Sequence, residues 1–163
     1  MTNTLKRGSI AVVGAAESDL GQVAQHTTPV DLMAQATMRA LDDCGLTLKD
    51  VDGLFVAATQ VRMGPMQLAE YLRIKPKVFD GTQIGGSSFM SHLAHAQAAI
   101  ELGLCEVAVI AYGSTQRSVS RAAAMVNATS AAVVGTWSCH RRPLYSVKVT
   151  AKRDGSHCHD RAR

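Results

Sequence analysis

The feature that most constrains the fold is a regular alternation of short apolar runs with stretches of helical spacing. The clearest run is CEVAVIAYGS, residues 105–114, which is almost continuously apolar and is typical of a strand buried on both faces of a parallel sheet. Other extended segments are expected in residues 8–21 (a buried strand leaving into a loop), 51–59 and 75–86. Strands that alternate with helices favour right-handed crossovers. The sequence therefore predicts an α/β fold, in βαβαβαβ order, with a four-stranded, mainly parallel sheet covered by helices.

Three helices are expected between these strands, at about residues 29–44, 65–73 and 87–103. The first has Thr28 as N-cap, Pro29 at the first helical position and Gly45 as its stop. The third begins at Ser87 or Ser88, either of which would cap it, and ends before a glycine. Apolar faces are predicted on the first two helices, from Val30, Met33, Ala40, Leu41 and Cys44 and from Met66, Ala69 and Leu72.

Charge divides the chain at residue 116. Residues 1–116 contain eight Lys or Arg and eleven Asp or Glu, whereas residues 117–163 contain nine Lys or Arg and only two acidic residues. This basic tail lacks a repeated basic-aromatic pattern, so nucleic-acid binding is disfavoured. We interpret residues 1–116 as the α/β region and residues 117–163 as a basic tail of uncertain order.

The sequence favours a cytoplasmic protein with reduced thiols. No apolar run approaches the roughly 18 residues of a membrane span, and the N-terminal residues lack the apolar core of a signal peptide. The four cysteines are widely scattered, with no CxxC pair.

The segment GTQIGGSS, residues 81–88, predicts a tight turn that leads into a helix. Amide N–H groups at such a point, together with the helix dipole, favour an anion or a developing oxyanion. The segment lacks GxGxxG, GxSxG and a phosphate-loop lysine, and its serines are read as caps. His92 and His95 could act as metal ligands or acid-base groups, but polar groups satisfied within the fold are favoured. A zinc site is disfavoured by poor ligand spacing among Cys139, His140, His157, Cys158 and His159.

The stretch TQIGGSSFMSHLAHAQAAIELGLCEVAVIAYGS resembles the thiolase superfamily, in which a third strand leads through a glycine-rich turn to a buried helix. IAVVGAAESDLG, TPVDLMAQATMRALDDCGLTLKDVDGLFVAAT and LAEYLRIKP resemble the preceding elements in the same order. The resemblance covers residues 7 to about 117 and is greatest to the sterol-carrier or nonspecific lipid-transfer type.

This resemblance implies a thiolase-like acyltransferase of lipid metabolism, of the acetyl-CoA acetyltransferase or lipid-transfer type. A coenzyme A thioester would be its substrate, with no separate cofactor, and it would form a homodimer through the third strand and the buried helix. Substrate contacts are expected at Gly85, Gly86, Ser87 and Ser88.

The chain departs from the family at the nucleophile. The acyl-accepting cysteine of thiolases matches Gly85 or Gly86 here, and Cys44 and Cys105 are expected in the core. The second α/β half of thiolases has no counterpart, and the tail suggests a truncated or out-of-frame end. We therefore expect no acyl-enzyme and no activity from this chain alone. The alternatives are a coenzyme A thioester aldolase subunit that works with an OB-fold partner, and a nonenzymatic dimerisation fragment.

Overall fold

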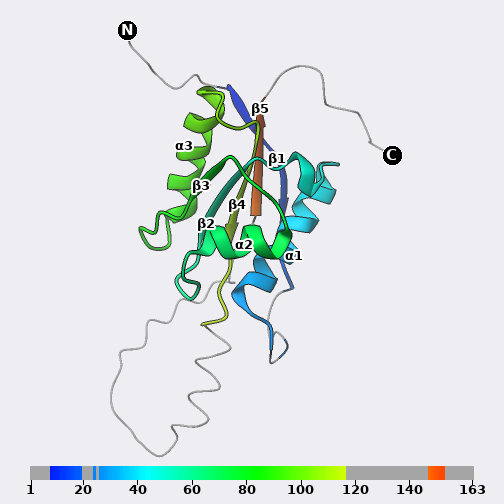
Figure 1. Ribbon diagram of the computed structural model, residues 1–163, viewed down its shortest axis with the longest axis vertical. Coiled ribbons are helices and arrows are strands. Elements are labelled where there is room, and N and C mark those ends of the chain that lie inside the picture. Colours follow the sequence, from blue (N-terminus) through cyan, green and yellow to red (C-terminus); the bar gives the residue numbers. More distant parts are fainter. Residues whose placement is uncertain (1–7, 20–23, 25, 117–146, 153–163) are drawn as a thin grey trace, which may run out of the picture.

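The computed structural model describes residues 8–19, 24, 26–116 and 147–152, which build one sheet with helices on both sides (Figure 1). In chain order the elements are β1 (Ile10–Ala16), α1 (Pro29–Asp43), a short 3-10 helix (Leu48–Asp50), β2 (Gly53–Ala57), α2 (Gly64–Leu72), β3 (Val78–Asp80), α3 (Ser88–Glu101), β4 (Val107–Tyr112) and β5 (Val147–Lys152). The predicted α/β class and the predicted strand and helix order are confirmed for residues 8–116.

The sheet has five strands in the order β1-β5-β4-β2-β3. The four strands predicted within residues 7–116 are present as β1 to β4, and the fifth, β5, was not predicted. β2 is parallel to both β3 and β4, whereas β5 runs antiparallel to its two neighbours, β4 and β1. β5 lies in the basic tail, and its sequence VKVTAK alternates between apolar and polar residues. That period of two is a strand signal which the charge of the tail obscured. Apart from β5, the tail lies outside the described residues, so the boundary at residue 116 stays a prediction.

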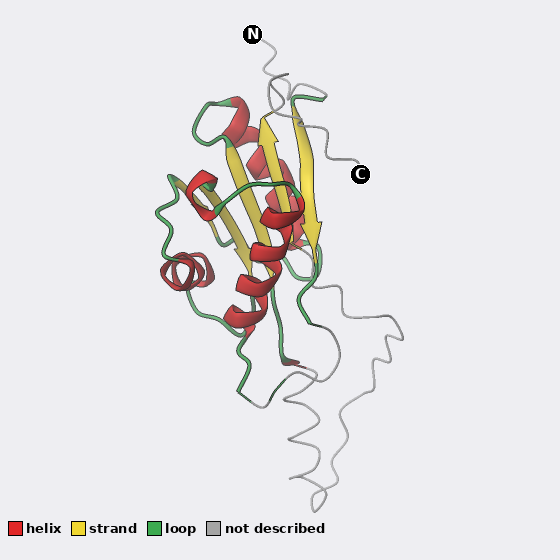
Figure 2. Cartoon of the chain, turned by 90° about the vertical axis from the view of Figure 1, so that its right-hand side faces the viewer, coloured by secondary structure: helices red, strands yellow, loops and turns green. Residues whose placement is uncertain are grey.

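The core is divided into two layers by the sheet. Leu54 and Val56 of β2 pack with α1 and α2, whereas Phe55, between them, packs with α3. Because side chains alternate along a strand, these two clusters lie on opposite faces. Figure 2 gives a second view of the strands, with helices on either side of them. All five residues of β2 and the four central residues of β4 are buried, as their continuous apolar runs predict.

β1 differs from the buried strand that its apolar sequence predicts. Val12 is 49% exposed and Val13 is 41% exposed, because β1 is an edge strand that pairs on one side only. The register shifts between Val12 and Gly14. At Gly14 the backbone comes so close to α1 that an added Cβ would lie 2.3 Å from the carbonyl oxygen of Ala40.

Helix α1 begins as the sequence predicts. Thr28 Oγ1 accepts a hydrogen bond from the N–H of Asp31, and the Asp31 carboxylate accepts one from the N–H of Thr28. This reciprocal capping box satisfies two amide groups that a helix start otherwise leaves unpaired. The predicted apolar face is confirmed at Met33, Ala40 and Leu41. On α2 the prediction is wrong for Met66, which is 49% exposed, and Leu68 is buried instead.

None of the helices in the described ranges is long and apolar enough to cross a membrane.

Candidate functional site

The candidate site lies where β2, β3 and β4 end, because parallel strands bring their following loops to one edge of the sheet. Two glutamine side chains, one from the loop after β2 and one from the loop after β3, connect the loop after β2 to the other two loops. Gln60 Oε1 accepts hydrogen bonds from the N–H of Thr115 and the hydroxyl of Ser114, at 2.7 and 2.9 Å. Gln83 Nε2 donates to the carbonyl oxygen of Ala58 at 2.9 Å. The glycine turn after β3 is thus anchored to the loop after β2.

The glycine turn is held at both ends by side chains that flank it. At its start, Asp80 Oδ1 accepts hydrogen bonds from the N–H and the hydroxyl of Thr82, at 2.8 and 2.7 Å. At its end, the buried Ser88 hydroxyl donates to the carbonyl oxygen of Gly85 at 2.7 Å and accepts from the N–H of Ile84 at 3.0 Å. Ser88 therefore closes the turn, whereas Ser87 occupies the N-cap position without a capping bond from its side chain.

The two glycines of the turn differ in conformation. Gly85 has a φ of +88°, a left-handed conformation that strains any residue with a side chain, whereas Gly86 has no such restriction. A Cβ added at either position would meet no atom within 4 Å. Only Gly86 could therefore accept a side chain without strain. Two glycines match the thiolase cysteine in the sequence. Of these, Gly86 is the one whose backbone conformation suits a residue with a side chain.

The turn presents amide groups at the start of α3. Within the described part of the chain, the N–H groups of Gly86 and Ser87 have no acceptor, and both residues are exposed. The first N–H groups of a helix carry the positive end of its dipole. This arrangement can accept a carbonyl or anionic oxygen.

The two histidines of α3 have different surroundings. His92 is fully buried, and its Nε2–H donates to the carbonyl oxygen of Thr82 at 2.9 Å. Its Nδ1 has no partner among the described residues. The prediction that the polar atoms of His92 are hydrogen-bonded within the fold is thus confirmed for Nε2 but not for Nδ1. Burial lowers the pKa of His92, an effect that the nearby negative charge of Asp80 opposes.

His95, one turn later, has a side chain that is 46% exposed. Its Nδ1 contacts Asp80 Oδ2, and its Nε2 lies 3.4 Å from the hydroxyl oxygen of Ser91. The contact with Asp80 could not be predicted from local sequence patterns, because fifteen residues separate it from His95. The spacing of Ser91 and His95, four residues apart on a helix, was a signal that could have been used.

Stability should fall as the pH is lowered from about 7 to 5, because His92 has a lowered pKa when folded. The unfolded chain takes up a proton below about 6.5, the ordinary pKa of histidine, before the buried imidazole does. Urea unfolding at several pH values would measure this. His92→Gln retains an N–H donor for Thr82 but cannot be protonated, so its unfolding free energy should change less over this range. An equal pH slope in both proteins would contradict the assignment.

The two described cysteines are not positioned as nucleophiles. Cys105 is buried, and burial, with a contribution from the Asp52 charge, raises the pKa of its thiol to about 11. Cys44 is half-buried rather than fully in the core; its thiol contacts the carbonyl oxygens of Ala40 and Leu41, and burial raises its pKa. Both thiols are therefore poorly ionised near neutral pH.

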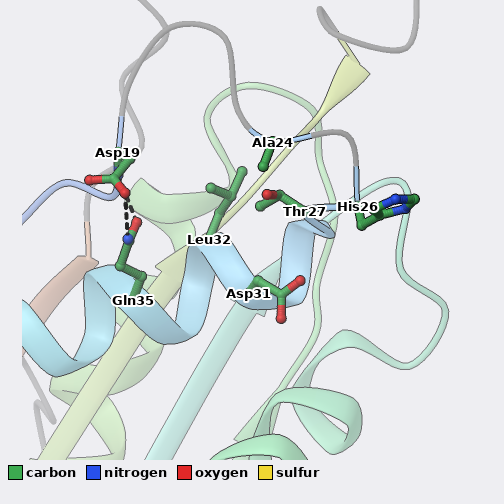
Figure 3. Close-up of a pocket in the computed structure, with 7 residues that line it drawn as sticks. All are labelled: Asp19, Ala24, His26, Thr27, Asp31, Leu32 and Gln35. Carbon is green, nitrogen blue, oxygen red and sulfur yellow. Dashed lines mark hydrogen bonds between the residues drawn. The ribbon is translucent and has the colours of Figure 1, made fainter.

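A hollow of about 500 Å³ lies beside the start of α1 (Figure 3). Gln35 reaches across it to Asp19, donating at 2.7 Å, and Arg39 also binds Asp19. The hydrogen bond from Arg39 and that from Gln35 lower the pKa of Asp19. The sequence did not predict this hollow, and none of its lining residues belongs to the glycine turn.

No group of three or more potential metal ligands occurs among the described residues. Cys139, His140, His157, Cys158 and His159, weighed above as zinc ligands, lie outside those residues.

Comparison with known proteins resolves the fold. No family model matches the sequence, and no curated protein does. Solved structures do match. A variant of Xanthomonas campestris OleA superposes with a TM-score of 0.71 at 14% identity, over 88% of this chain and 58% of that one. The fold is thiolase-like.

Two further structures agree. 3-oxoacyl-(acyl carrier protein) synthase III of Xanthomonas oryzae gives a TM-score of 0.72 at 14% identity, over 88% of this chain and 56% of that one. Another OleA variant, solved with bound lauric acid and lauroyl-CoA, gives 0.71 at 14% identity, over the same shares of the two chains. The chain thus spans somewhat more than half the length of these thiolase-like condensing enzymes.

Proposed function

We propose that this chain supplies the acyl-CoA-binding α/β half of a thiolase-like acyltransferase, of the lipid-transfer or acetyl-CoA acetyltransferase type. Its glycine turn would bind the thioester carbonyl without a cysteine nucleophile. Thiolysis and Claisen condensation by this chain alone are not part of the proposal. The bound lauroyl-CoA of one OleA variant supports a coenzyme A thioester as the ligand class.

The observation that carries this proposal is the pair of amide groups at Gly86 and Ser87. They stand at the start of a 14-residue helix, without an acceptor in the described residues, on a turn that Asp80 and Ser88 hold in place. A fixed turn can receive an oxygen without reorganising, which is the basis of oxyanion stabilisation.

Binding of butyryl-CoA, measured by isothermal titration calorimetry, tests the proposal. Gly86→Pro removes one N–H donor and should weaken binding by about threefold to tenfold, the effect of one hydrogen bond. Gly86→Ala keeps the N–H and has open space for its methyl group, so it should bind as the unchanged chain does. Circular dichroism checks that both variants fold. Absence of butyryl-CoA binding by the unchanged chain would refute the proposed function.

We also propose a homodimer in which β3 and α3 meet their counterparts. β3 is an edge strand; Phe79 within it is 48% exposed, and Ile84, four residues after it, is 61% exposed. An edge strand with apolar neighbours is a surface suited to pairing with a second copy.

Multi-angle light scattering on the purified chain should give twice the monomer mass. Phe79→Lys, which places a charge on this edge, should shift the population toward monomer. A monodisperse monomer at micromolar concentration would contradict the interface.

A further inference from the structure

We propose that Ser91, His95 and Asp80 form a proton-relay triad in which the Ser91 hydroxyl is an acyl-accepting nucleophile. The substrates would be esters or thioesters with an apolar acyl group. For coenzyme A thioesters the inference rests on the proposed function, whereas the reactivity of Ser91 toward a serine-directed probe does not.

The three side chains contact one another in the order that activates a serine. Asp80 Oδ2 pairs with His95 Nδ1, and His95 Nε2 lies 3.4 Å from Ser91 Oγ. A triad of this kind is identified by geometry and roles, and the bond from nucleophile to base is often long in the absence of a ligand. Ser91 and His95 meet because residues four apart share one face of a helix.

Asp80 is fixed in the orientation that such a relay needs. Its Oδ1 accepts two hydrogen bonds from Thr82, which leaves Oδ2 directed at His95. Burial alone would raise the pKa of Asp80, but the hydrogen bonds from Thr82 and His95 lower it overall. Asp80 therefore remains a carboxylate that orients the imidazole of His95.

His95, and not His92, is suited to be the base. His92 is fully buried and already bonded through Nε2 to the carbonyl oxygen of Thr82. In the single chain His95 has a half-exposed side chain, and Ser91 beside it is partly exposed, so solvent and a ligand can reach the pair in the monomer.

The amides of the glycine turn lie one helical turn before Ser91. The N–H of Ser91 donates to the carbonyl oxygen of Ser87, and helical side chains lean toward the N-terminus. Negative charge that develops near Ser91 therefore lies about one helical turn from the N–H groups of Gly86 and Ser87. The exposed apolar side chain of Met90 offers a contact to an acyl chain.

The chemical step needs no reactant besides the ester or thioester and water. Ser91 Oγ attacks the carbonyl carbon while His95 Nε2 takes the hydroxyl proton. The bond from carbon to the leaving sulfur or oxygen then breaks, and His95 returns the proton to the leaving group. Water, deprotonated by His95, then attacks the Ser91 ester, releasing a carboxylic acid and restoring the hydroxyl.

A fluorophosphonate probe tests the triad on the full chain, since it phosphonylates activated serine hydroxyls. We expect one adduct, located at Ser91 by tandem mass spectrometry and absent in Ser91→Ala. His95→Gln should slow labelling by about a hundredfold or more, the usual contribution of a general base. Asp80→Asn should also slow labelling.

His26→Gln is the matched control, because His26 is exposed and lies before α1, on the opposite side of the sheet from α3. It should label at the unchanged rate. Circular dichroism of each variant separates loss of reactivity from loss of fold. Absence of labelling at Ser91 in the folded chain, or equal rates in His95→Gln and the unchanged chain, would overturn the triad. Labelling without butyryl-CoA binding would retain the triad while refuting the proposed function.

Discussion

Gly86→Cys should give the chain a cysteine that accepts an acyl group as a thioester. The new thiol would stand at the start of α3, where the helix dipole and amide groups lower a thiol pKa. The backbone at Gly86 permits a side chain, and an added Cβ meets no atom within 4 Å. Incubation with butyryl-CoA should then add one butyryl group per chain, measured by intact-mass spectrometry.

Two comparisons make this result specific. The unchanged chain should acquire no thioester, because the pKa of the Cys105 thiol is raised to about 11 and that of the Cys44 thiol is also raised. Since Cys139 and Cys158 are present in both proteins, the unchanged chain also serves as the control for acylation at those two residues. Neutral hydroxylamine removes a thioester but leaves an oxyester on Ser91. Gly85→Cys should react poorly and fold less stably, since its φ is +88°. Equal amounts of hydroxylamine-sensitive butyrylation in the unchanged chain and in Gly86→Cys would refute the assignment.

Gly14→Val should lower the unfolding free energy by about 3 kcal/mol or more, a large share of the total stability. Any Cβ at this position would lie 2.3 Å from the carbonyl oxygen of Ala40 and 3.1 Å from Cys44 Sγ. The first contact is with helix backbone, so α1 and β1 would have to separate. Overpacking usually costs about 1–3 kcal/mol and occasionally more, out of a total stability of about 5–15 kcal/mol.

Urea unfolding followed by circular dichroism measures this loss. Gly86→Ala is the control, because it adds a methyl group in open space and should change the unfolding free energy by less than about 0.5 kcal/mol. A Gly14→Val variant as stable as Gly86→Ala would show that α1 does not pack on β1 as described.

Local signals in the sequence located the helices and strands within a few residues. Thr28 and Pro29 set the start of α1, because a cap and a fixed φ act over one helical turn. The apolar run before Gly113 predicted a buried strand, and β4 is one. The resemblance to thiolases was confirmed at the level of the fold, although the lipid-transfer subtype stays a proposal.

The candidate site was predicted in part. The glycine turn was recognised from its residues, but the different roles of its two serines were not, since those depend on where each hydroxyl points. The position of β1 at the edge was also missed, because burial depends on neighbours that the strand's own sequence does not specify. β5 was hidden by the composition of the segment around it.

By itself, the sequence determined the alternation of elements, the capped start of α1 and the glycine turn, because these depend on residues a few positions apart. Only the tertiary structure decided that β5 lies between β1 and β4, that Gln60 bonds to Thr115 and that Asp80 meets His95. These contacts join residues that are distant in the chain. They form because pairing of the strands brings their ends to one edge of the sheet, which no local pattern encodes.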